Sequence, residues 1–147
     1  MIKKILVATD ASAASNRAVS MAAYMAACHE AELLIIHVIR DMQLPAQMKQ
    51  APELEAFTNT RDDILRQVAE TILHDAEVQA KKGGATKVKT AIGSGDPASS
   101  IIRFSTQRKI DTIVVGSRGL SKVKGILMGS VSRKITNNAD VNCLLVR

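Results

Sequence analysis

Aromatic side chains are almost absent from this sequence, whose 147 residues include two phenylalanines, one tyrosine and no tryptophan. Proteins that bind single-stranded nucleic acid usually stack the bases on aromatic rings, and so few rings cannot form such a platform. The formal net charge of +6 comes from lysines and arginines that are scattered along the chain, with no basic run longer than a pair. We therefore predict no nucleic-acid partner and expect the positive charge to attract small polyanions.

Cysteine is also rare, since the chain has only Cys28 and Cys143, each in an apolar stretch. No CxxC spacing and no nearby cluster of histidine and cysteine accompanies them, which argues against a redox or metal site. We predict that both are small buried hydrophobic side chains in a reducing cytosol.

Long apolar runs are missing as well. The N-terminal apolar run stops before Asp10, too early for a signal peptide, and the uncharged run 18–28 is too short to span a bilayer. We therefore expect a cytoplasmic protein with no membrane partner. Since 46% of the residues are apolar, the chain can bury an aliphatic core, and we predict one domain over residues 1–147.

Short apolar runs without alternation, typical of strands buried on both faces, follow one another along the chain and are separated by helical patterns. The expected strands are 3–10, 32–38, 87–92, 111–116 and 142–146, and the expected helices are 18–28, 54–82, one that begins at Pro97 with Asp96 as N-cap, and 130–138. Residues 40–52 are expected to form a long loop. This order predicts an α/β fold, an open parallel sheet with helices on both faces.

Helix boundaries are marked by residues with known preferences. Ser12 or Ser15 is expected to cap the first helix, and Gly83-Gly84 to end the second. Six apolar residues of the second helix recur at helical spacing and are expected to form its buried stripe: Ile64, Leu65, Val68, Ile72, Ala76 and Ala80.

Ligands of open parallel sheets bind beyond the carboxyl ends of the strands, where the strand order reverses. Three predicted ends are therefore of interest: Thr9-Asp10, His37-Val38 and Val115-Gly116. The ring of His37 is expected to pack as an ordinary strand side chain.

The segment from Gly116 to Ser132 has four glycines and four serines directly after a predicted buried strand. Glycine allows a ligand to approach the main chain, and Gly129-Ser130 opens a helix whose free N–H groups suit phosphate. A Walker A loop is excluded because Gly-Lys-Ser/Thr does not occur in the chain. The alternative is a surface loop rich in turn residues. Side chains that could add contacts to phosphate are Arg118, Lys122, Lys124, Ser130 and Ser132.

A second glycine pattern, Gly93-x-Gly95-x-x-Ala98, also follows a predicted strand and precedes a helix. It matches a dinucleotide fingerprint weakly, because it follows the third strand and Pro97 lacks an N–H donor. No acidic residue stands about twenty positions further on to hold a ribose. We interpret Asp96-Pro97 as a helix start instead.

These blocks together resemble the universal stress protein family over the full length of the chain. The spacing G-x2-G-x9-G-[S/T] of its nucleotide-binding members is matched by Gly116, Gly119, Gly129 and Ser130. Other blocks that resemble the family are ILVATDAS (residues 5–12), IIHVI (35–39), GDPASSIIRF (95–104) and GSVSRKI (129–135).

The resemblance implies an adenine nucleotide alpha hydrolase-like fold, with five parallel strands in the order 3-2-1-4-5. It also implies an ATP-type ligand (ATP, ADP or AMP), with Mg²⁺ or Mn²⁺ as a companion ion. Asp10 would contact the ribose or the metal, although it could instead cap a helix, and the backbone of Val38 would contact adenine. The nucleotide-binding residues implied in this way are Ala8, Thr9, Asp10, Val38, Val115, Gly116, Gly119, Gly129, Ser130 and Val131.

Relatives of this kind often form a homodimer through the last strand, here Cys143 to Val146, and act on an unidentified protein partner. Many carry Cys-Pro before that strand, whereas this chain has Val141-Asn142-Cys143, so the details of the pairing stay open. No carboxylate or glutamine near the glycine segment suggests a base for hydrolysis, and we assign no catalytic residue. We expect a nucleotide-dependent regulatory module of the stress response with little or no hydrolysis. The alternatives are a slow ATPase or phosphotransferase using Asp10 and a divalent metal, and a nucleotide-free dimeric scaffold.

Overall fold

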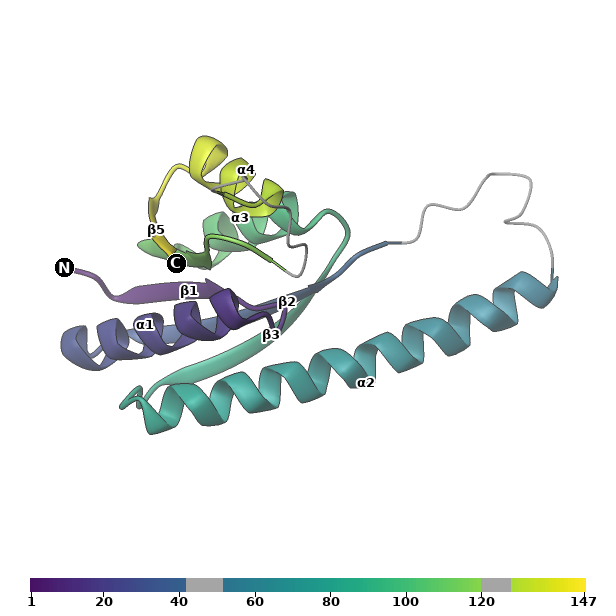
Figure 1. Cartoon of the computed structure of the whole chain (residues 1–147), viewed down its shortest axis with the longest axis horizontal. Helices are drawn as coiled ribbons and strands as arrows, with labels where there is room; N and C mark the ends of the chain where they lie inside the picture. The colour runs from purple at the N-terminus through teal and green to yellow at the C-terminus, as the bar shows by residue number, and fades with distance from the viewer. Residues whose placement is uncertain (42–51, 120–127) are drawn as a thin grey trace.

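The computed structural model describes residues 1–41, 52–119 and 128–147. Strands and helices alternate along these residues, as the sequence predicts (Figure 1). The elements are β1 (Lys4–Ala8), α1 (Ala13–His29), β2 (Glu32–Ile39), α2 (Pro52–Lys82), β3 (Val88–Ser94), α3 (Pro97–Arg108), β4 (Thr112–Gly116), α4 (Ser130–Asn138) and β5 (Asn142–Val146).

The five strands form one parallel sheet in the order β3-β2-β1-β4-β5, which confirms the expected order. β1 lies at its centre, with Ala8 beside Ile36 of β2 and Val7 beside Val114 of β4. The chain moves outward from β1 through β2 and β3, then returns to the other side of β1 as β4. The order of the strands therefore reverses between β1 and β4, at the carboxyl ends where open sheets bind ligands.

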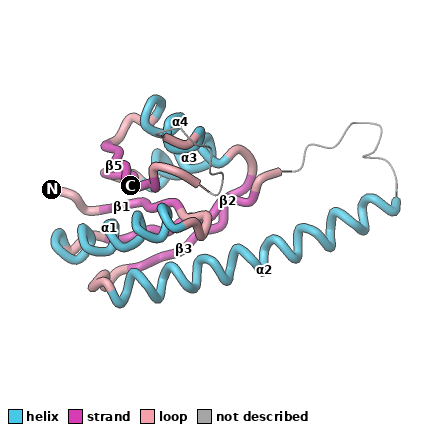
Figure 2. The backbone as a smooth tube through the Cα atoms, viewed as in Figure 1, coloured by secondary structure: helices cyan, strands magenta, loops and turns pink. Residues whose placement is uncertain are grey.

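Helices cover both faces of the sheet, with α1 and α2 on one side and α3 and α4 on the other (Figures 1 and 2). Ile5 and Val7 of β1 pack with the first pair of helices, whereas Leu6 packs with the second, and all three side chains are fully buried. Because both faces are covered, successive residues of a strand are apolar, and this explains the uninterrupted apolar runs in the sequence.

Local capping signals set the starts of two helices. Ser12, rather than Ser15, is the N-cap of α1, and its hydroxyl accepts a hydrogen bond from the backbone N–H of Ser15 at 3.2 Å. The helix therefore begins at Ala13, as the first of the two predicted caps implies, and it includes the residues before the apolar run 18–28. Asp96 is the N-cap of α3 with Pro97 as the first helical residue, as predicted.

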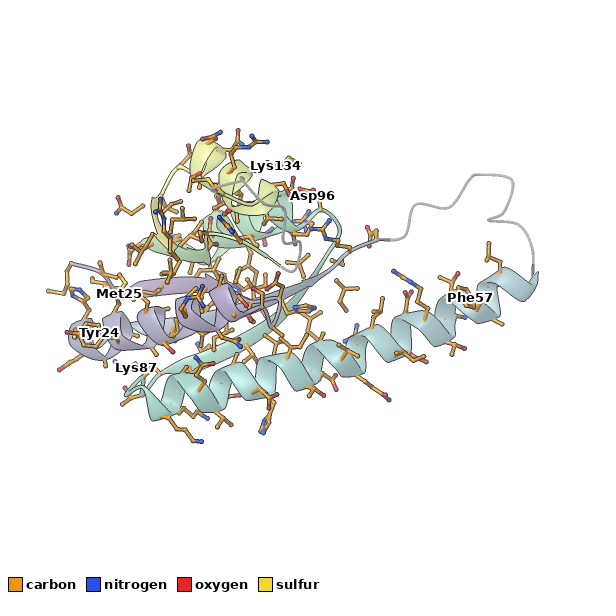
Figure 3. The ribbon with its side chains drawn as sticks, in the orientation of Figure 1. Tyr24, Met25, Phe57, Lys87, Asp96 and Lys134 are labelled. Carbon is orange, nitrogen blue, oxygen red and sulfur yellow. The ribbon has the colours of Figure 1, made fainter. Side chains whose placement is uncertain are left out.

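The predicted buried stripe of α2 is wrong in its first half. Ile64 and Val68 are 55% and 48% exposed, whereas Ala69 and Leu73 are buried. The N-terminal part of the helix extends beyond the sheet, and Phe57 lies near its far end (Figure 3). No strand of the described residues lies beneath this part, so helical periodicity alone cannot indicate which side of the helix is covered.

The prediction that both cysteines are buried is also wrong. Cys28 is exposed near the end of α1, and Cys143 is half-buried on β5, which lies at the edge of the sheet. Partial burial raises the pKa of the Cys143 thiol. Over the residues that the structure describes, no helix is both long and apolar enough to cross a membrane.

Candidate functional site

A cavity of about 660 Å³ lies at the carboxyl ends of β1, β2 and β4. It is lined by all ten residues that the family resemblance implies: Ala8, Thr9, Asp10, Val38, Val115, Gly116, Gly119, Gly129, Ser130 and Val131. These residues come from segments more than a hundred positions apart in the chain, and the parallel sheet brings them together at one edge.

The turn between β1 and α1 forms one wall of the cavity. Oδ1 of Asp10 accepts a hydrogen bond from the backbone N–H of Ser12 at 3.0 Å, so Asp10 stabilises the turn while Ser12 caps the helix. Ala11 has a φ of 63°, in the left-handed region that side chains with a Cβ rarely adopt. This strained turn presents the second carboxylate oxygen of Asp10 toward Gly119, where an added Cβ would lie 2.8 Å from Oδ2.

The three glycines of the motif have different structural roles. A Cβ at Gly116 would lie 2.8 Å from the backbone carbon of Ala14, so this glycine allows α1 to pack closely against β4. Among the described residues, a Cβ at Gly129 would meet no atom closer than 3.5 Å, an ordinary van der Waals distance, and the φ of Gly129 is −68°. Packing against the described residues therefore requires glycine at Gly116 but not at Gly129, which lines the cavity.

The start of α4 faces the cavity without a side-chain cap. Gly129 is its N-cap and offers no side chain, so the first N–H groups of the helix lack the partner that Ser12 and Asp96 supply elsewhere. The backbone N–H of Gly129 donates to the carbonyl of Ser117 at 2.7 Å, which fixes the entry to the helix. Such an N-terminus attracts anions.

Ser132 lines the cavity, and its hydroxyl also has a structural role. It lies within 3.2 Å of the carbonyl of Ser117 and 3.0 Å of the carbonyl of Gly129, to which it donates. Ser132 is 4% exposed, and its only proton is used by these carbonyls. Ser130 is exposed and lines the cavity.

Charged residues at the cavity are few. Among the described residues, the titratable side chains that line it are Asp10, His37, Arg40 and Arg118. Arg118 stands beside the glycine segment and Arg40 just after β2, so both ends of the cavity carry a positive charge. The other predicted cations of the loop, at positions 122 and 124, lie outside the described residues.

The second glycine pattern serves packing and a turn. A Cβ at Gly93 would lie 2.9 Å from the hydroxyl oxygen of Ser100, so glycine there lets α3 approach β3. Gly95 has a φ of +100° and forms the turn before α3. Neither glycine lines the cavity, whereas Pro97 at the start of α3 does. This arrangement agrees with the interpretation of Asp96-Pro97 as a helix start.

Sequence reasoning missed several lining residues. His37 was predicted to pack as an ordinary strand residue, but its half-buried ring lines the cavity and bonds to the carbonyl of Thr9. Val68 and Ile72 of α2 form an apolar wall, and Ile101 of α3 lines the cavity as well. Position at a strand end could have indicated His37, but no local signal places α2 over the cavity.

Metal ligands are sparse in the described residues. Across residues 1–41, 52–119 and 128–147, no group of three or more histidine, cysteine, aspartate or glutamate side chains could hold a metal ion. A metal held by protein groups alone therefore has no site in this part of the chain. A metal that binds chiefly through phosphate oxygens needs only one or two carboxylates, and Asp10 lines the cavity.

Comparison with known proteins identifies relatives over the whole chain. A family model described as the universal stress protein family matches residues 1–147. Universal stress protein YxiE of Bacillus subtilis is 31% identical over 151 residues, with 100% of both chains covered. The structure of universal stress protein UspA from Lactobacillus plantarum has a TM-score of 0.87 at 25% identity, covering 99% of this chain and 98% of that one. A universal stress protein crystallised in complex with cAMP has a TM-score of 0.72 at 28% identity, covering 99% and 97%.

Proposed function

Because this chain belongs to the universal stress protein family, we propose that it is a regulatory module that binds an adenine nucleotide, ATP or else ADP or AMP, with little or no hydrolysis. The observation that carries the proposal is the single cavity lined by all ten residues of the expected site. Its volume of about 660 Å³ lies in the range typical of small-molecule sites. The complex of a relative with cAMP supports an adenine nucleotide as the ligand class.

The phosphates would lie at the glycine end of the cavity. Gly129 leaves space there, and the uncapped N–H groups that begin α4 point their positive dipole end toward it. Arg118 adds a positive charge on the same side, and the exposed Ser130 could donate its hydroxyl proton to a phosphate oxygen. Backbone N–H groups suit any phosphate chain, so this end does not by itself distinguish ATP from ADP or AMP.

The nucleoside would lie over the ends of β1 and β2. Val38 lines this part of the cavity beside the apolar side chains of Val68 and Ile72, which suit a flat aromatic base. The carboxylate of Asp10 lies between the two regions, where it can accept hydrogen bonds from ribose hydroxyls. In this arrangement, one carboxylate separates an apolar base site from a phosphate site rich in N–H donors.

A divalent ion, Mg²⁺ or Mn²⁺, would accompany a nucleotide with several phosphates. Mg²⁺ usually keeps waters and phosphate oxygens as ligands with one or two carboxylates, and Asp10 can supply one. When bound, the ion would neutralise phosphate charge. Hydrolysis also needs a group that positions water, and Asp10 is the only carboxylate among the described lining residues.

We also propose that two copies pair through β5. This strand is the last of the sheet, and β4 is its only partner among the described strands. An edge strand with free N–H and C=O groups is a template for pairing with another chain. Asn142 begins β5 where many relatives carry a proline, so the edge keeps an N–H donor that proline would remove.

The test is to denature freshly purified protein and identify any released nucleotide by mass spectrometry, followed by titration with ATP, ADP and AMP. The variant Gly129→Val is the control, because its side chain would occupy the proposed phosphate position. Adenine nucleotide released by the wild type but not by folded Gly129→Val supports the proposal. If nothing is released and no added nucleotide binds, the scaffold interpretation replaces it. Turnover that is abolished by Asp10→Ala would instead favour the ATPase.

A further inference from the structure

The ring of His37 links the end of β2 to the turn that follows β1. Its Nδ1 lies 2.9 Å from the carbonyl oxygen of Thr9. A backbone carbonyl can only accept, so Nδ1 must carry the proton and donate it. The backbone N–H of Thr9 donates in return to the carbonyl of Ile36 at 3.0 Å, so the two segments are joined by bonds in both directions. His37 is therefore held as the Nδ1–H tautomer.

Thr9 is the residue on which the β1–α1 turn depends. It is 5% exposed, and its hydroxyl accepts from the backbone N–H of Ala11 at 3.2 Å and bonds to the hydroxyl of Ser15 at 3.2 Å. The backbone N–H of Asp10 donates to the same serine hydroxyl at 3.4 Å. These bonds hold Ala11 at its positive φ, a conformation that persists only when the surrounding structure enforces it.

The orientation of Asp10 follows from this turn. Its Oδ1 is used by the backbone N–H of Ser12, which leaves Oδ2 directed toward Gly119 across the cavity. A small rotation of the peptide between Thr9 and Asp10 would move both Ala11, which has the left-handed conformation, and the carboxylate of Asp10. The Nδ1–H of His37 holds the carbonyl oxygen of Thr9, which belongs to this peptide.

We propose that His37 is a positioning residue of the nucleotide site, which acts by holding the carbonyl of Thr9 and thereby orients the carboxylate of Asp10 toward the ligand. This inference rests on the proposed function and adds a residue to it. Asparagine can place its side-chain N–H close to where Nδ1–H of histidine lies, whereas phenylalanine keeps the ring volume without a donor. Comparing the two variants therefore separates the effect of losing the hydrogen bond from the effect of losing the ring.

The experiment compares full-length wild type, His37→Asn and His37→Phe, with His74→Phe as a matched control at an exposed histidine of α2. Long-range ¹H–¹⁵N spectra of the wild type should place the ring proton of His37 on Nδ1, with exposed His29 and His74 as references. Titration with ATP should give about fivefold weaker binding for His37→Phe, the effect of one typical hydrogen bond. His37→Asn should bind within about twofold of the wild type, and His74→Phe should be unchanged.

Two results would overturn the inference: a His37 ring whose only proton lies on Nε2, with none on Nδ1, or equal ATP affinity of His37→Phe and the wild type. If His37→Phe does not fold, the inference is tested by the position of the His37 ring proton and by the ATP affinity of His37→Asn, which should stay within about twofold of the wild type. If the wild type binds no adenine nucleotide, the proposed function is refuted independently of the effect of His37 on the turn. In that case, unchanged amide signals of Ala11 and Ser12 in His37→Phe would also refute the role of His37 in holding the turn.

Discussion

Replacing Gly129 by valine should abolish nucleotide binding while leaving the fold intact. A Cβ at this position fits without a clash, since among the described residues the atoms nearest to it are the Ser117 carbonyl oxygen and the Ser132 hydroxyl oxygen, both at 3.5 Å, an ordinary van der Waals distance. The φ of −68° is available to any residue. The valine methyl groups would fill the volume beside the first N–H groups of α4, which we assign to phosphate.

The expected stability change is small because only the N-cap preference is lost. Glycine is better than valine at an N-cap by up to about 1 kcal/mol, which corresponds to a melting temperature lower by about 2–4 °C in a chain of this size. Saturating nucleotide has a larger effect: at a hundred times the dissociation constant it stabilises the wild type by about 2.7 kcal/mol, or about 5–11 °C. The two effects are therefore distinguishable in one melting experiment.

The contrasting substitution is Gly116→Ala. Its Cβ would lie 2.8 Å from the backbone carbon of Ala14 and 2.9 Å from the backbone nitrogen of Ser15, and backbone atoms cannot move aside cheaply. Overpacking of this kind destabilises by about 1–3 kcal/mol, so the melting temperature without ligand should fall by about 2–12 °C. Stability without ligand therefore falls more for Gly116→Ala than for Gly129→Val.

The assay is thermal unfolding by circular dichroism with and without ATP, together with calorimetric titration. We expect Gly129→Val to melt near the wild type but to lose the shift caused by ATP. Gly129→Ala should give a smaller loss of affinity, because one methyl group fills less of the space. A folded Gly129→Val protein that binds ATP with wild-type affinity would refute the phosphate assignment, and an undisturbed Gly116→Ala would refute the packing argument.

Three further predictions concern other parts of the chain. Hydrogen bonds from the backbone N–H groups of Lys3, at 2.7 Å, and Lys4, at 2.8 Å, hold the pKa of Asp111 below its unfolded-state value. This stabilisation is present above the unfolded-state pKa of about 3.9 and is lost as the pH falls through the folded-state value, so Asp111→Asn should flatten the acid dependence of the free energy of unfolding in urea titrations. Asp10→Ala should weaken ATP binding by about tenfold, as expected for hydrogen bonds to a charged group, and equal calorimetric affinities would exclude its contact with the ligand. Sedimentation velocity should detect a dimer that remains at micromolar concentrations, whereas a monomer throughout would contradict pairing through β5.

Much of the fold could be predicted from local patterns. Asp96-Pro97 marks the start of α3 because an N-cap and a proline with fixed φ act within one turn of helix. The uninterrupted apolar runs predict strands covered on both faces, and their alternation with helices predicts a parallel sheet. The positions of Gly116 and Gly129 follow from the sequence too, but their different roles do not, because only the approach of α1 shows which glycine packing requires.

The wrong predictions concern features that depend on contacts between segments far apart in the chain. Val68 has the spacing of a buried residue, yet it is 48% exposed, because the extent of the sheet beneath α2 is not encoded within the helix. Cys28 is exposed for a similar reason, since burial depends on which side of α1 meets the sheet. The bonds of the Ser132 hydroxyl to the carbonyls of Ser117 and Gly129 could not be predicted either, because they form only when the segment folds.

Periodicity, caps and motif spacing act over short stretches of chain, and they therefore specify the elements, their parallel arrangement and the family. The contacts between these elements follow only from the folded arrangement. It placed the ring of His37 against the carbonyl of Thr9, 28 residues away, and the carboxylate of Asp10 opposite Gly119. Such contacts depend on the crossing of strands and helices at one edge of the sheet, a geometry that exists only after the whole core has packed.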